Sequence, residues 1–224
     1  LVTLKHLGLA QLDYQGFEPL IRVNMDPSAI TVRSDAPRKT LKEFLDYAKA
    51  DPGKVKVGNS GPGGIWHLAA ASLEQKADVK FNHVPYSGGA APAILALLGG
   101  NIDAVAVSPA EVDNNVRAGK LKVLAVASDK RVKTMPDVPT MKEAGTDVVL
   151  GTWRGLAVPK GTPAPVKQKL HDSFKSAMED KAFVDYMDKA GLGIAYLSSA
   201  DFQKSIEDQS AAFGDLITKL GLKK

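Results

Sequence analysis

A regular alternation of strand-like and helix-like segments between Ser28 and Ser128 constrains the fold more than any other feature of the sequence. Short apolar runs with the residue types of buried strands occupy residues 29–33, 54–60, 81–86, 102–107 and 120–128. Segments with the length and pattern of helices occupy residues 41–51, 63–75, 91–98 and 109–119. This order is typical of a mainly parallel sheet with helices on both faces. The loops after the strands of such a sheet meet at one ligand-binding edge.

The helix expected at residues 41–51 carries the clearest local signals. Thr40 and Glu43 have the spacing of a capping box, in which each side chain bonds the backbone N–H of the other residue. One helical face gathers Leu41, Phe44, Leu45 and Ala48. We therefore expect this face to be buried.

The pattern changes after Ser128. Residues 129–145 contain two prolines and predict an irregular loop that ends in a short helix, and residues 148–163 predict an extended segment. Helices are expected at 164–179, 181–191 and 198–221, with a strand at 193–197. Along the last helix, the residues expected to form a buried stripe are Phe202, Ile206, Ser210, Phe213 and Ile217.

Composition excludes several classes of protein. The 224 residues carry a net charge of +4 with both signs interspersed, and no basic stripe with interleaved aromatic residues marks a nucleic-acid binder. The absence of cysteine excludes disulfides, thiolate metal sites and a cysteine nucleophile. The longest apolar runs are well short of the roughly 20 residues that span a bilayer. No signal peptide is visible at Leu1, and without an initiating Met we expect a mature or truncated product.

The small-residue loop Asn59–Gly64 follows the second expected strand and matches no named phosphate or nucleophile motif. It lacks the Gly-Lys-Ser/Thr ending of a P-loop. Trp66 stands where a dinucleotide fingerprint has its third glycine, and Pro62 breaks the nucleophile elbow. Backbone N–H groups at a helix start, with the Ser60 hydroxyl beside them, favour an anion. A tight turn that needs small residues is an equal alternative.

His67 lies on the helix just after this loop. With Ser60 and Asp103 it could form the triad of a serine hydrolase, although a buried or helix-capping role is more frequent for such a histidine. His67 and His83 lack metal-ligand spacing and have no cluster of carboxylates around them. We therefore expect no metal and no cofactor, and the hydrolase is the weaker alternative.

The second glycine loop, Tyr86–Gly89, separates another expected strand from a helix. Tyr86 and Ser87 offer hydroxyl groups, and Gly88 and Gly89 leave backbone N–H groups uncovered. A carboxylate there would accept several hydrogen bonds at once, each contributing about 1.5–3 kcal/mol. The alternative is a plain turn, which two such loops at one sheet edge make less attractive.

Two further residues are candidate contacts. Ser108 follows a third neighbouring strand, where it either contacts a ligand or caps the next helix. Arg154, in Trp153-Arg154-Gly155, either holds a second carboxylate in bidentate fashion or is an ordinary surface residue. Both alternatives stay open for each residue.

Taken together, these residues resemble the periplasmic solute-binding proteins of tripartite tricarboxylate transporters, also called Bug proteins. The matching segments, in chain order, are FEPLIRV, NSGPGGIWHL, VPYSGGAAPAILALLGGNIDA, GKLKVLAVASDKR, MPDVPTMKEAG and TWRGLAVPKGTP. The resemblance implies an α/β, two-lobe periplasmic-binding-protein fold of type II, with mixed, mostly parallel sheets covered by helices. It also implies that the loop at Tyr86–Gly89 holds a carboxylate, partly through ordered waters, and that the loop at Asn59–Gly61 contributes.

The function that the resemblance implies is capture of a small organic acid and its delivery to a membrane permease. The acid is a mono-, di- or tricarboxylate or an amino acid. Sensing for a membrane sensor kinase is an alternative. The implied location is periplasmic, and the protein is not an enzyme. The expected ligand-binding residues are Asn59, Ser60, Gly61, His67, Tyr86, Ser87, Gly88, Gly89, Ser108 and Arg154.

The departure from the family lies at the front of the chain. The first strand and Gly-rich loop of family members have no counterpart after Leu1. We therefore expect an incomplete first lobe at residues 1–27 plus 152–224 and a complete second lobe at 28–151. An incomplete lobe exposes apolar surface and predicts association or poor solubility, whereas a full-length member is expected to be a monomer.

Overall fold

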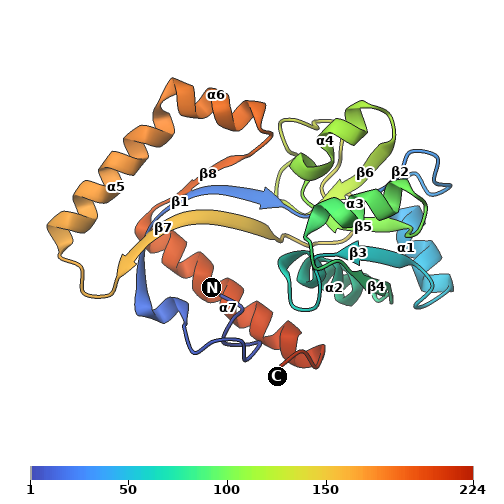
Figure 1. The fold of residues 1–224 in the computed structure, drawn as a ribbon, viewed down its shortest axis with the longest axis horizontal. Helices are drawn as coiled ribbons and strands as arrows, with labels where there is room; N and C mark the ends of the chain where they lie inside the picture. The colour runs from blue at the N-terminus through green and yellow to red at the C-terminus, as the bar shows by residue number, and fades with distance from the viewer. Residues whose placement is uncertain (1, 224) are drawn as a thin grey trace. The chain divides into compact units, whose positions relative to one another are not determined.

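A computed structural model of the protein describes residues 2–223. By their contacts these residues divide into two compact units (Figure 1). The unit named here the sheet unit consists of Asp26–Thr152. The unit named here the terminal unit consists of the residues up to Met25 and those from Trp153 onward. Each unit is an α/β structure with its own sheet.

The sheet unit is built on a five-stranded mixed sheet with the order β4-β3-β5-β2-β6. Its strands are β2 (Ala29–Arg33), β3 (Lys56–Asn59), β4 (Asn82–Pro85), β5 (Ala104–Val107) and β6 (Leu121–Val126). The strand β3 pairs in parallel with β4 and β5, whereas β2 is antiparallel to both β5 and β6. The sequence predicted the positions of these strands. It did not predict the direction of β2, because a strand buried on both faces has the same apolar pattern whichever way it runs.

Helices cover both faces of this sheet. They are α1 (Leu41–Ala50), α2 (Ile65–Ala77), α3 (Ala90–Leu98) and α4 (Pro109–Arg117). Strand residues alternate between two apolar clusters, so Ala104 and Ala106 pack with α1, and Val105 and Val107 pack with α3. Three layers follow from this alternation, as the sequence predicted.

The predicted apolar face of α1 is confirmed, since the structure buries Leu41, Phe44, Leu45 and Ala48. The hydroxyl of Thr40 accepts the Glu43 N–H at 3.2 Å, as a capping box requires. The Glu43 carboxylate, however, accepts the N–H of Lys39 at 2.6 Å, one residue before the N-cap. The cap is therefore formed with a shifted second bond.

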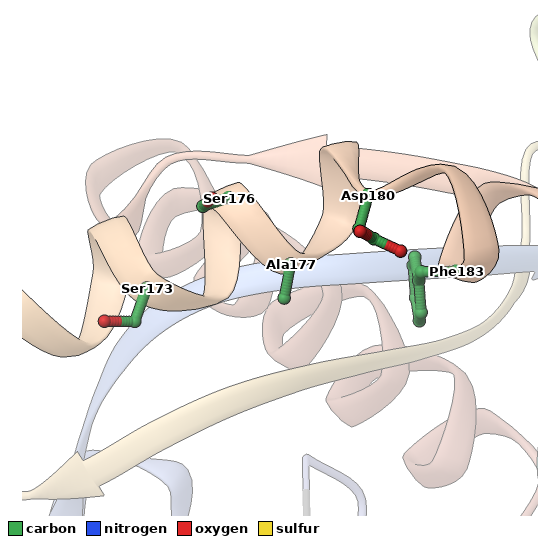
Figure 2. A pocket seen from close by; sticks show the side chains of 5 residues that line it. All are labelled: Ser173, Ser176, Ala177, Asp180 and Phe183. Carbon is green, nitrogen blue, oxygen red and sulfur yellow. The ribbon is translucent and has the colours of Figure 1, made fainter.

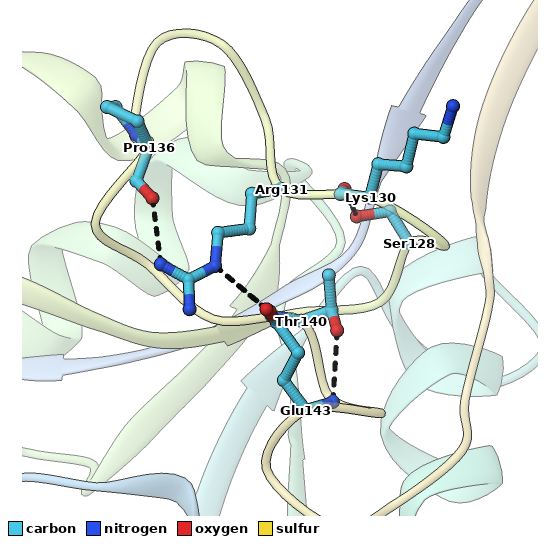
Figure 3. A network of polar contacts seen from close by, with 6 residues as sticks. All are labelled: Ser128, Lys130, Arg131, Pro136, Thr140 and Glu143. Carbon is cyan, nitrogen blue, oxygen red and sulfur yellow. Dashed lines mark hydrogen bonds and ion pairs between the residues drawn. The ribbon is translucent and has the colours of Figure 1, made fainter.

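The short helix predicted at the end of residues 129–145 is wrong, because the structure has a single turn there. The turn begins where the Thr140 hydroxyl accepts the Glu143 N–H at 3.1 Å, and Gly145 ends it at φ +91°. Figure 3 shows how Arg131 closes the loop, with its Nε 3.0 Å from Glu143 Oε2 and its Nη1 3.1 Å from the Pro136 carbonyl oxygen. Hydrogen bonding from Arg131 holds the pKa of Glu143 below its usual range.

The terminal unit has a three-stranded sheet with the order β7-β1-β8. Its elements are η1 (Tyr14–Gly16), β1 (Phe17–Pro27), β7 (Gly151–Pro159), α5 (Ala164–Glu179), α6 (Lys181–Lys189), β8 (Ile194–Leu197) and α7 (Ser199–Lys219). The stripe predicted for the long helix is confirmed, since the buried residues of α7 include Phe202, Ile206, Ser210, Phe213 and Ile217. Trp153 fixes this helix, with its ring edge-on to Phe202 at 4.9 Å and its Nε1 donating to Gln209 at 2.8 Å.

An open hollow of about 490 Å³ lies along α5 and the start of α6 in the terminal unit. Figure 2 shows its lining residues, Ser173, Ser176, Ala177, Asp180 and Phe183. The Phe183 ring packs on the small apolar cluster around Leu20, Ile21, Val158 and Met178. None of the helices within residues 2–223 is long and apolar enough to cross a membrane.

Candidate functional site

The two glycine loops of the sheet unit lie side by side. The Tyr86 N–H donates to the Asn59 carbonyl oxygen at 2.9 Å, which continues the parallel pairing of β3 and β4 by one step. The first loop leads into α2 and the second into α3. The prediction that these loops lie close together is therefore confirmed.

The glycines of the first loop direct their N–H groups inward. The Gly61 N–H donates to Asn59 Oδ1 at 3.0 Å, and the Gly63 N–H donates to His67 Nδ1 at 3.1 Å. The Gly64 N–H donates to the Gly61 carbonyl oxygen at 3.0 Å. Gly61 and Gly63 have φ values of +92° and +75°, which residues other than glycine rarely adopt. These glycines thus shape the loop and saturate their own N–H groups.

Behind this loop lies a chain of polar side chains. Asn59 is 1% exposed, and its Nδ2 lies 3.2 Å from His83 Nδ1 and 3.5 Å from the Val57 carbonyl oxygen. His83 Nε2 lies 2.7 Å from Glu74 Oε2 on α2. The other carboxylate oxygen of Glu74 accepts the Phe81 N–H at 2.5 Å. Sequence reasoning missed this chain, because its members lie 15 and 9 residues apart and share no motif.

His67 is buried at 8% exposure and stacks edge-on against His83, with ring centroids 4.7 Å apart. Burial, with the neighbouring His83 as a second cause, lowers the pKa of His67 from 6.5 to about 4. His67 is therefore neutral at pH 7, and its Nδ1 accepts a hydrogen bond from the Gly63 N–H. In a hydrolase triad the corresponding nitrogen donates to the aspartate. Asp103 instead accepts the Lys56 N–H at 2.8 Å, so this geometry does not support the triad.

Ser60 lies at the turn into α2. Its Oγ is enclosed and has no hydrogen-bond partner among residues 2–223. A Cβ at Gly64 would lie 2.5 Å from this oxygen, so a glycine is needed where the hydroxyl packs. A buried hydroxyl without a partner costs about 1–3 kcal/mol.

The second loop differs from the first in its free donors. Ser87 and Gly88 are exposed, and their N–H groups make no hydrogen bond within the described part of the chain. The Gly89 N–H donates to the Tyr86 carbonyl oxygen at 3.3 Å, and Gly89 then serves as the N-cap of α3 at φ +83°. The loop therefore presents two adjacent backbone donors beside the start of a helix.

The Tyr86 ring is held by a close approach from β3. A Cβ at Gly58 would lie 3.3 Å from Tyr86 Cε2 and only 2.6 Å from Ile102 Cδ1. The ring is partly buried against the apolar cluster of α3. Gly58, which the sequence analysis passed over as part of a strand, thus sets the position of the aromatic ring in the second loop.

The two remaining predicted site residues have structural partners. Ser108 is 4% exposed at the N-cap of α4, where its hydroxyl and its N–H both donate to the Glu111 carboxylate, at 3.0 and 2.9 Å. The structure thus shows the capping role of Ser108. Arg154 belongs to the terminal unit, is exposed, and donates from Nη1 to Asn24 Oδ1 at 3.1 Å. Groups of three metal-ligating side chains do not occur among residues 2–223.

The comparisons with known proteins decide the family. The profile described as tripartite tricarboxylate transporter family receptor matches residues 4–222. The chain belongs to this family. A solute-binding protein of the family from Polaromonas is 45% identical, with a TM-score of 0.89 over 97% of this chain and 75% of that chain. The periplasmic binding protein BugD is 34% identical, with a TM-score of 0.75 over 93% of this chain and 70% of that chain.

A curated relative from Cupriavidus necator, described as a UPF0065 protein, is 37% identical over 195 residues. This match covers 87% of the chain and 59% of the relative, so the chain spans well under two thirds of that protein. The family match and the solved neighbours confirm the predicted family and the predicted α/β fold of periplasmic binding proteins. The family is described as a transporter receptor, and its Polaromonas member as a solute-binding protein.

Proposed function

We propose that this chain captures a small organic carboxylate through its two adjacent glycine loops and delivers it to a membrane permease. The observation that carries the proposal concerns the N–H groups of Ser87 and Gly88, beside the start of α3, which are exposed and make no hydrogen bond with the described residues. Two adjacent backbone donors match the two oxygens of a carboxylate, and the helix start adds a partial positive charge.

The hydroxyl groups of the loops complete the donor set. Tyr86 and Ser87 carry hydroxyls in the second loop, and the Ser60 hydroxyl of the first loop has no partner in the described part of the chain. Each hydrogen bond to a charged carboxylate contributes about 1.5–3 kcal/mol. In this proposal Asn59 and Gly61 act by holding the loop, and His67 acts in the same way through the Gly63 N–H. Gly89 starts the helix.

Ser108 and Arg154 enter the proposal as further contacts. Ser108 reaches a ligand only with a lone pair or through water, because its hydroxyl hydrogen is directed to Glu111. Arg154 is exposed and carries the bidentate donor geometry that carboxylates accept. In this proposal Ser108 belongs to the lobe at residues 28–151, and Arg154 belongs to the lobe at residues 1–27 plus 152–224.

Membership of a transporter receptor family supports the partner and the location. A receptor of a membrane transporter binds and releases its solute without chemical change, so the proposed role is extracytoplasmic binding without catalysis. The buried neutral His67 and the bonded Asp103 agree with this role, because neither is arranged to activate Ser60.

Amide NMR of the chain during titration with citrate, malate and succinate, each beside its neutral amide, tests the proposal. We expect acids to shift the Ser87 and Gly88 resonances and the amides to leave them in place. Saturable binding at a hundredfold excess over Kd must also stabilise the fold by about 2.7 kcal/mol. Equal responses to acid and amide, or shifts confined to other segments, would refute carboxylate capture by this loop.

Replacement of Tyr86 by Phe isolates one donor of the site. The variant keeps the ring that packs near Gly58 and removes only the hydroxyl. We expect about tenfold or more weaker binding of the responding acid. Tyr47→Phe, in the same unit on α1, is the matched control and leaves the affinity unchanged. Unchanged affinity of Tyr86→Phe would remove the hydroxyl from the donor set.

A further inference from the structure

The donor and acceptor roles in the hydrogen bonds behind the first glycine loop are fixed by the groups at both ends, the Gly61 N–H and the Glu74 carboxylate. A backbone N–H only donates, so the Asn59 atom 3.0 Å from the Gly61 nitrogen must be the amide oxygen. The amide nitrogen of Asn59 then points to His83 Nδ1 and to the Val57 carbonyl oxygen, both acceptors. His83 Nδ1 must therefore be the unprotonated nitrogen of the ring.

The other half of the chain agrees with this assignment. With Nδ1 unprotonated, neutral His83 carries its hydrogen on Nε2, which lies 2.7 Å from a carboxylate oxygen of Glu74. The second oxygen of Glu74 is occupied by the Phe81 N–H at 2.5 Å. The carboxylate thus holds the histidine in one tautomer from a helix that packs behind the sheet. Every donor in this series of hydrogen bonds, from Asn59 through His83 to Glu74, therefore faces an acceptor.

The alternative arrangement fails at the glycine loop. A hydrogen on His83 Nδ1 would face the amide hydrogens of Asn59. Turning the amide over would bring its nitrogen against the Gly61 N–H, which is also a donor. Gly61 has φ +92° and depends on this bond to fix the turn. The titratable groups facing His83 among the described residues are Glu74 and His67, both on α2.

We propose that His83 and Glu74 are positioning residues for ligand capture, acting through the Asn59 amide to hold the first glycine loop in its binding shape. The inference rests on the proposed function for its effect on affinity. The loop it holds contains Ser60 and accepts the Tyr86 N–H, so both parts of the donor set depend on its position. Neither residue touches the ligand in this scheme. Each acts only through the loop.

Two substitutions of His83 separate hydrogen bonding from packing. Asparagine places a carbonyl oxygen near the position of Nδ1, so His83→Asn retains an acceptor for the Asn59 amide. Phenylalanine retains the ring volume against Phe81 and His67 but offers no acceptor. A purely structural role predicts that His83→Phe is the milder change. The positioning role predicts the reverse order for the loop and for the ligand.

The experiment measures hydrogen exchange of the Gly61 amide and affinity for a responding carboxylate such as malate, citrate or succinate. We expect His83→Phe to accelerate Gly61 exchange about tenfold and to weaken binding about tenfold, and His83→Asn to keep both within about threefold of the parent. His171→Phe, in the terminal unit, is the control and changes neither. In the parent, the ring-nitrogen NMR shifts of His83 must report the Nε2–H tautomer.

The two levels of the argument fail separately. If no carboxylate binds the parent protein while Gly61 exchange follows the predicted order, the proposed function is wrong. The role of His83 and Glu74 in holding the first glycine loop then still stands. If carboxylates bind and His83→Phe retains Gly61 protection and affinity, the positioning role is refuted. An Nδ1–H tautomer in the parent would refute it as well, whatever the affinities.

Discussion

The buried His67 predicts a specific loss of stability in mild acid. Its pKa is about 4 in the folded protein and about 6.5 in the unfolded chain, so the unfolded chain takes up the proton first. The free energy of unfolding is therefore unaffected above about pH 7.5 and falls as the pH drops from 6.5 toward 4. The lowered pKa corresponds to a loss of about 2 kcal/mol at pH 5 and about 3 kcal/mol below pH 4.

Urea unfolding at pH 7.5 and pH 5.0 measures this loss, with His67→Asn as the reference. Asparagine retains an acceptor for the Gly63 N–H and does not titrate. We expect the parent to lose about 2 kcal/mol more than His67→Asn between the two pH values. Exposed carboxylates with lowered pKa values, such as Glu143, titrate in both proteins and cancel. Equal losses in both proteins would refute the assignment of a buried neutral histidine.

Three further predictions concern packing, helix capping and loop closure in the sheet unit. Gly58→Ala overpacks the site 2.6 Å from Ile102 Cδ1, so we expect a loss of about 1–3 kcal/mol in urea unfolding and an altered near-UV signal. Thr40→Ala removes the N-cap acceptor of α1 and is expected to cost about 1 kcal/mol, whereas Thr40→Ser retains it. Arg131→Ala removes the bonds to Glu143 and Pro136 that close the loop. We expect faster proteolysis within residues 129–146 in this variant than in Arg131→Lys.

Periodic sequence patterns predicted most of the elements, because the buried face of a helix or strand places apolar residues at the period of that element. The stripe from Phe202 to Ile217 and the face around Phe44 repeat at helical spacing, and both are buried as expected. The apolar runs at Ala29–Arg33 and Ala104–Val107 likewise became strands of the central sheet. In each case the information lies within one segment of the chain.

Features that depend on distant partners were not predictable in the same way. The orientation of β2 follows from its neighbours β5 and β6, more than 70 residues away in sequence. The turn at residues 141–145 stops after one turn because Gly145 takes a positive φ, although its residues suit a helix. The chain from Asn59 to Glu74 through His83 joins two strands and a helix. No local pattern marks any of these.

The two glycine loops make the distinction concrete for the site. Their compositions are similar, and the sequence is compatible with an anion site or a plain turn at each. The first loop bonds the N–H groups of Gly61 and Gly63 to Asn59 and His67, whereas those of Ser87 and Gly88 in the second have no partner among residues 2–223. Substitutions of the residues that support the first loop should therefore change the shape of the site, and substitutions in the second loop should change its hydrogen-bond donors. Affinity lost through shape returns with any side chain that restores the acceptor, but affinity lost through a donor returns only with that donor.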